Sequence, residues 1–129
     1  MIVSKRKHVG TVLMLAAVFL NGCGCTAAGC VNGLTVKLQS LPSAPFKIEL
    51  LIGGVLQPTP ESASCTGSHQ CSQEAGFSTT ASDNVAVRVT SPLGVRTTEF
   101  GHITYSDQHP NGEGCGPSCR NATVTAQIP

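Results

Sequence analysis

Seven cysteines are the residues of this 129-residue chain most able to do chemistry. A thiol can form a disulfide, ligate a metal ion or carry a covalent modification. Six of the cysteines fall into three close pairs, namely Cys25 with Cys30, Cys65 with Cys71, and Cys115 with Cys119. The seventh, Cys23, follows a long apolar segment. Because seven is odd, at least one cysteine cannot form a disulfide within the chain.

Other side chains add no recognisable catalytic or ligand-binding pattern. A structural zinc site usually combines two close ligand pairs, and the cysteines and histidines here show no such set. His69, His102 and His109 are expected at the solvated surface, and Glu49 and Glu99 on outer strand faces opposite Lys or Arg. The sequence contains neither a G-x-S-x-G nucleophile motif nor a phosphate-binding glycine loop. We therefore predict no catalytic residue, no metal site and no cofactor.

The first 22 residues have the organisation of an export signal. Residues 5–7 are basic, and residues 9–20 are apolar except for Gly10 and Thr11. Twelve helical residues span about 18 Å, too little for a hydrocarbon core of about 30 Å. This pattern is typical of a secretory signal peptide. The alternative is a buried N-terminal helix, but the segment is uncapped and apolar on all sides.

The end of this segment resembles the lipobox of bacterial lipoproteins. Leu20-Asn21-Gly22-Cys23 places an aliphatic residue and two small residues before a cysteine, with Asn21 departing from the usual Ala or Ser. The resemblance implies lipid on the Cys23 sulfur, cleavage after residue 22, and acylation of the new amino terminus. Gly24 at the sorting position would then favour the outer membrane of the cell envelope. Cleavage by the ordinary signal peptidase, with Cys23 free or disulfide-bonded, is the competing interpretation.

Lipidation of Cys23 would leave six cysteines for disulfides in an oxidising compartment. Six cysteines allow fifteen connectivities, and pairing within each close pair is the simplest. A long-range bridge such as Cys30 to Cys119 is the alternative. Both residues directly precede predicted strands, and the first and last strands of immunoglobulin-like sandwiches can run in parallel. Chain entropy assigns about 2 kcal/mol to a small loop and roughly 4–5 kcal/mol to such a long one.

Alternation of apolar and polar residues predicts strands throughout the exported part. The expected strands cover residues 31–39, 46–52, 85–91, 95–105 with a bend near Gly101, and 120–128. Residues 88–98 predict a hairpin that turns at Pro92 and Gly94. The segment 57–84 is too long for a structureless loop, so we expect the Cys65–Cys71 staple and a short edge strand at 77–80 within it.

These strands predict an all-β fold, a small disulfide-stapled β-sandwich over residues 31–129. Residues 23–30 would be the lipid anchor and a short tether. The domain is similar to immunoglobulin-like or transthyretin-like modules of secreted bacterial proteins, and residues 105–124 resemble the last hairpin of small bacterial lipoproteins. Its apolar core is thin, so the disulfides would compensate for it.

Charge narrows the choice of partner. Charged residues make up 12% of the chain, which excludes a basic face for nucleic acid. Residues 23–129 contain five basic and seven acidic residues, a net charge of −2. We predict a membrane partner through the lipid anchor and a binding or structural role that presents loops 57–84 and 106–119 to another envelope protein. An accessory factor or inhibitor of an exported enzyme is the alternative, and a small hydrolase with an unrecognised site is a third.

Overall fold

The computed structural model describes residues 29–67 and 71–129. Over these residues the chain is all-β, with a single turn of 3-10 helix, η1 (Glu61–Ala63). The strands are β1 (Gly33–Leu38), β2 (Phe46–Ile52), β3 (Val55–Leu56), β4 (Ser64–Cys65), β5 (Glu74–Ser78), β6 (Val85–Ser91), β7 (Gly94–Phe100), β8 (Ser106–Gln108) and β9 (Cys119–Ala126). No helix within the described ranges has the length and apolarity to cross a bilayer.

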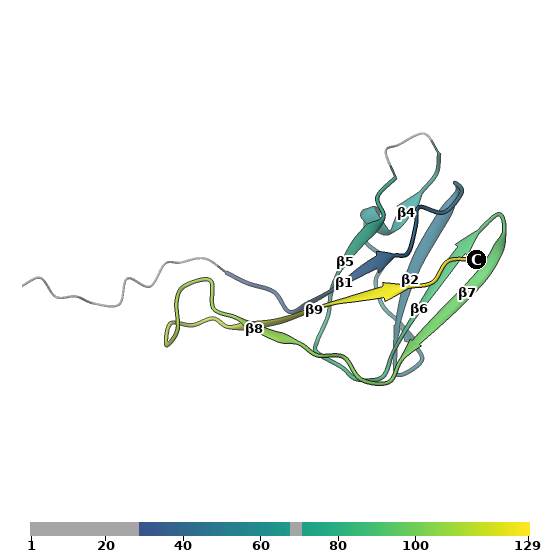
Figure 1. The fold of residues 1–129 in the computed structure, drawn as a ribbon. Coiled ribbons are helices and arrows are strands. Elements are labelled where there is room, and N and C mark those ends of the chain that lie inside the picture. The colour runs from purple at the N-terminus through teal and green to yellow at the C-terminus, as the bar shows by residue number, and fades with distance from the viewer. Residues whose placement is uncertain (1–28, 68–70) are drawn as a thin grey trace, which may run out of the picture.

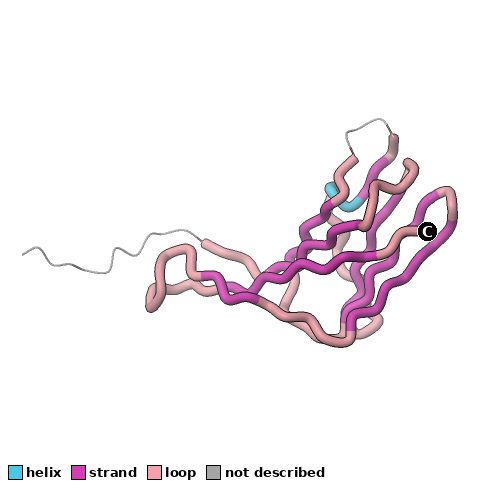
Figure 2. The backbone as a smooth tube through the Cα atoms, viewed as in Figure 1, coloured by secondary structure: helices cyan, strands magenta, loops and turns pink. Residues whose placement is uncertain are grey.

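The strands form two sheets (Figures 1 and 2). The first sheet has the order β5-β1-β9-β8, and the second has the order β3-β2-β6-β7, with β4 also paired to β2. Neighbouring strands are antiparallel except β1 and β9, which are parallel, with Leu34 beside Ala122 and Val36 beside Val124. The first and last strands of the described chain therefore lie side by side.

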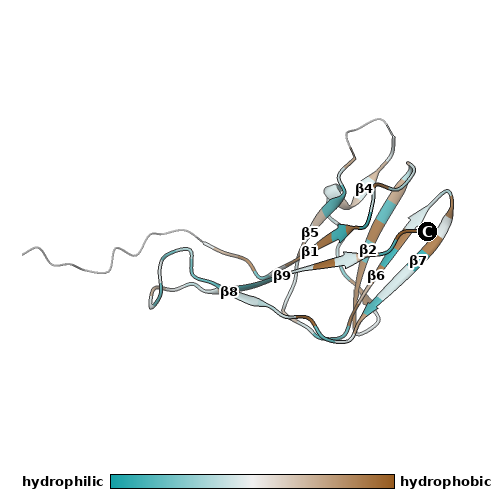
Figure 3. Cartoon of the chain, in the orientation of Figure 1, coloured by the Kyte–Doolittle hydropathy of each residue, from teal (hydrophilic) through white to brown (hydrophobic). Residues whose placement is uncertain are grey.

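A single apolar core lies between the two sheets. It takes every second residue of the longer strands, because alternate side chains point to opposite faces of a sheet. Figure 3 shows apolar segments along β1, β2 and β6. The buried aliphatic residues include Leu34, Val36 and Leu38 from β1, Ile48 and Leu50 from β2, Val85, Val87 and Val89 from β6, and Val124 from β9. Strand β7 contributes only the partly buried Phe100.

The disulfides correct the simplest pairing. Cys65 is joined to Cys71, as local pairing predicts. Cys30 is joined to Cys119, with 5.8 Å between their Cα atoms, so local pairs Cys25–Cys30 and Cys115–Cys119 are both wrong. The long-range alternative holds because the parallel pairing of β1 and β9 brings Cys30, three residues before β1, beside Cys119 at the start of β9. Cys115 is also disulfide-bonded. Cys23 and Cys25 lie outside the described residues.

Most predicted strands are confirmed, including 46–52 and the hairpin of β6 and β7. The predicted bent strand 95–105 is wrong, because β7 ends at Phe100 and the chain crosses to the first sheet before β8 begins. Two features hold the segment that crosses between the sheets in place. Ile103 is buried in the core, and the Tyr105 hydroxyl is hydrogen-bonded to the backbone of Ser82. The edge strand expected at 77–80 lies earlier, at Glu74–Ser78.

Candidate functional site on the outer face of the second sheet

Three charged side chains occupy the middle of the outer face of the second sheet, the face turned away from the core. Glu49 of β2 lies directly opposite Arg88 of β6. The Arg88 Nε donates to Glu49 Oε2 at 2.7 Å, and the Lys47 Nζ donates to Glu49 Oε1 at 3.0 Å. Glu49 is only 8% exposed, whereas the two cationic side chains are about half exposed. A buried carboxylate thus fixes two cations that reach solvent.

The two cations shift the titration of this carboxyl group. The hydrogen bond from Arg88 is the largest influence and holds the pKa of Glu49 below its ordinary value, with Lys47 acting in the same direction against burial. The same contact raises the pKa of Arg88 above its ordinary value. Glu49 is therefore ionised at neutral pH, and its negative charge is balanced by both neighbours.

A hollow of about 620 Å³ opens on this face beside Arg88. Its apolar lining comes from Leu51 of β2, Ala86 of β6 and Phe100 of β7. Two carboxylates, Asp83 and Glu99, stand in its wall. Because Arg88 is already paired with Glu49, the hollow is net acidic. This volume is in the range of small-ligand sites, which also combine an apolar lining with a few charged groups.

A second hollow of about 780 Å³ lies on the other side of the ion triad. Lys47 lines it together with hydroxyl groups, among them Ser62, Ser64 and Thr66, and with Glu61 of η1. Part of this lining comes from the segment between β3 and Cys71. Lys47 and Arg88 therefore border different hollows, and Glu49 lies between them.

The predicted site residues take the following places. Both described histidines are exposed, as expected, and the His102 Nδ1 lies 3.5 Å from Asp83 Oδ1. His69 lies outside the described residues. Glu49 has the predicted basic neighbours. Glu99 lies on the outer face as predicted, but the residue opposite it is Ala86 and not a Lys or Arg. Within the described ranges, no group of three or more His, Cys, Asp or Glu residues is arranged to hold a metal ion.

Sequence reasoning missed the hollow beside Arg88. Asp83 precedes β6 and Glu99 lies near the end of β7, and only the pairing of β6 with β7 brings them to one end of the sheet. The alternation of Val85, Val87 and Val89 did indicate that Arg88 faces outward. The sequence pattern did not indicate the register between strands, because tertiary packing sets it.

Comparison with known proteins identifies no relative, since no family model, no curated protein and no solved structure matches the chain.

Proposed function

We propose that this protein is a lipid-anchored domain of the bacterial cell envelope with a binding role, carrying its lipid on Cys23. The cysteine count is the observation that supports the anchor most directly. Four described cysteines are paired with one another, and Cys115 is also disulfide-bonded. Of the seven cysteines this leaves Cys23 and Cys25, and the proposal gives the lipid to one of them and the bond with Cys115 to the other. A lipidated Cys23 needs no disulfide partner, so the proposal assigns Cys25 to Cys115.

The anchor would join the domain at the Cys30 end of β1. Two or three acyl chains hold a protein stably on a membrane, whereas one chain binds marginally. The bridge from Cys30 to Cys119 ties the start of β1 to the start of β9. A pull on the tether would thus be shared by two neighbouring strands. Residues 1–22 would be the signal peptide, and Gly24 would favour the outer membrane.

The fold supports a more specific proposal, an immunoglobulin-like or transthyretin-like β-sandwich. Two sheets enclose one core, and the first and last strands run in parallel. The binding role would use the outer face of the second sheet, where the acidic hollow and the ion triad lie. An apolar lining with a few fixed charged groups is the usual make-up of a binding site for a polar partner.

Metabolic labelling with an alkyne analogue of palmitate tests the anchor. The wild-type chain should take up label and lose residues 1–22, and Cys23→Ala should remain unlabelled and uncleaved. Cys25→Ser is the matched control and should keep the label. Non-reducing peptide mapping of the processed protein should link Cys25 to Cys115. A peptide linking Cys23 to Cys115 would contradict the lipid assignment, because that sulfur would be consumed.

A further inference from the structure

We infer that strand β7 is a docking edge that accepts an extended segment of a partner protein as an additional antiparallel strand, with a basic side chain of that segment placed beside Glu99. The inference depends on the binding role proposed above but not on the lipid anchor. Loss of palmitate labelling would therefore leave it standing, and failure of strand docking would leave the anchor standing.

The register of β2, β6 and β7 shows which backbone groups of β7 point away from β6. Gly53 N–H donates to the Asn84 carbonyl at 2.8 Å, in register with the antiparallel pairing of β2 and β6. In an antiparallel sheet, successive residues of a strand bond alternately to the strands on its two sides. The backbone N–H and C=O of Val87, like those of the other odd-numbered residues of β6, therefore bond to β7. Val87 is opposite Thr98, so Thr98 bonds to β6 and its neighbour Thr97 turns its N–H and C=O away.

Strand β7 is the longest open edge in the described part of the chain. Its seven residues form the outer strand of the second sheet (Figures 1 and 2). The other outer strands are shorter: β3 has two residues, β8 three and β5 five. β7 has no proline and no lysine, and its charged residues are Arg96 and Glu99. Its free N–H and C=O groups belong to Val95, Thr97 and Glu99.

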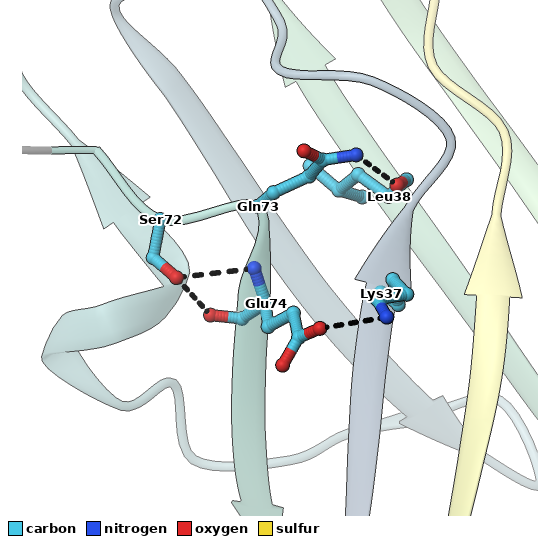
Figure 4. Close-up of polar contacts among 5 residues, drawn as sticks. All are labelled: Lys37, Leu38, Ser72, Gln73 and Glu74. Carbon is cyan, nitrogen blue, oxygen red and sulfur yellow. Dashed lines mark hydrogen bonds and ion pairs between the residues drawn. The ribbon is translucent and has the colours of Figure 1, made fainter.

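The opposite edge, β5, is tied to the domain close to its own backbone, whereas β7 is tied beyond β6 through the side chains of Arg96 and Thr98, which bond to Gln127. η1 contacts β5, and Lys37 of β1 pairs with Glu74 of β5 at 2.9 Å. Figure 4 shows that Gln73 Nε2 donates to the Leu38 carbonyl at 2.8 Å, and that Ser72 Oγ is bonded to both backbone groups of Glu74. Local contacts thus tie the start of this strand to the domain.

Charges along β7 select the incoming segment. Glu99 and Val95 lie on the outer face four residues apart, and Arg96 lies on the other face, where it donates to the Gln127 side chain. An antiparallel strand matches this pattern with the sequence Lys-Thr-Thr-Glu-Val, whose Lys faces Glu99 and whose Glu faces Arg96. Glu99 also lines the acidic hollow with Asp83, so a long basic side chain gains a second carboxylate there.

A second copy of this chain fits the edge less well. Antiparallel self-pairing centred on Thr97 would set Val95 against Glu99 of the other copy and bring the two Arg96 side chains diagonally together. An apolar Val95 beside a charged Glu99 lacks the stabilisation of a matched cross-strand pair, and the two Arg96 side chains repel each other. Because the Thr97-centred register of self-pairing is disfavoured, we assign the edge to a different protein, with main-chain hydrogen bonds supplying affinity and the Lys beside Glu99 supplying specificity.

Amide hydrogen exchange on the processed, disulfide-intact domain tests this proposal. The probe is a capped nonapeptide with Lys-Thr-Thr-Glu-Val at its centre. Binding should slow exchange at the Val95, Thr97 and Glu99 amides, while Arg96 and Thr98 exchange slowly in both states. A peptide with the two charged residues exchanged should bind about tenfold more weakly, since two attractive pairs become repulsive. Equal binding of the two peptides would overturn the proposal.

Two variants make the test specific to the edge. Thr97→Pro removes an N–H that β6 does not use, so it should abolish binding while the fold persists, and Thr97→Val should bind normally. Glu99→Lys should prefer a peptide whose Lys is replaced by Glu, and the exposed Glu113→Lys should keep the original preference. The proposal fails if Glu99→Lys does not change the preference. It also fails if the free protein is a dimer that Thr97→Pro converts to monomer, because a second copy would then occupy the edge.

Discussion

The hydroxyl of Tyr105 makes two hydrogen bonds to the backbone of Ser82. It donates to the Ser82 carbonyl at 3.0 Å and accepts from the Ser82 N–H at 3.1 Å. Ser82 lies just before β6 of the second sheet, and Tyr105 lies just before β8 of the first. The guanidinium of Arg120 covers the Tyr105 ring, 5.5 Å from its centre. One side chain therefore joins the segments that lead into both sheets.

Removing this hydroxyl should destabilise the domain measurably. Tyr105→Phe keeps the ring but leaves both backbone groups of Ser82 without this partner, and we expect a loss of about 1–2 kcal/mol in the free energy of unfolding. Urea denaturation followed by circular dichroism measures it. Thr104→Val, at an exposed neighbouring position, should change stability by less than about 0.5 kcal/mol. Equal effects of both variants would show that the Tyr105 contact adds no stability.

The ion triad should make stability depend on pH. The pKa of Glu49 is lower in the folded protein than its ordinary value of 4.5, so its ionised form stabilises the fold above that pH, and this contribution disappears as pH falls through the folded pKa. Glu49→Gln should cost roughly 1–2 kcal/mol at pH 7, between values for exposed and buried pairs. Its difference from wild type should shrink below about pH 4.5. A difference that stays constant down to pH 2 would contradict this account.

The core predicts a strong contrast between two leucines. Leu50 is fully buried between the sheets, and Leu93 is 74% exposed at the turn between β6 and β7. Leu50→Ala should cost about 2–5 kcal/mol, since it loses apolar burial and leaves a cavity. Leu93→Ala should cost less than about 0.5 kcal/mol. Thermal unfolding of the disulfide-intact variants measures both, and similar losses would mean that the core is assigned wrongly.

The sequence alone determined the class of fold. Strict alternation in Val85, Val87 and Val89 predicts a half-buried strand whichever strand it pairs with, because side-chain direction has a period of two. The hairpin of β6 and β7 could also be predicted, since a short turn with Pro92 and Gly94 brings neighbouring segments together. Export and lipidation remain predictions from the first 25 residues.

Tertiary structure decided everything that depends on segments far apart in the chain. Only the parallel register of β1 and β9 selects the Cys30–Cys119 bridge over local pairing. Only the pairing of β2 with β6 sets Glu49 opposite Arg88, and only the order of strands leaves β7 at an edge. The physical reason is that local alternation fixes which face a side chain takes, whereas strand order and register depend on how both sheets bury their apolar faces together.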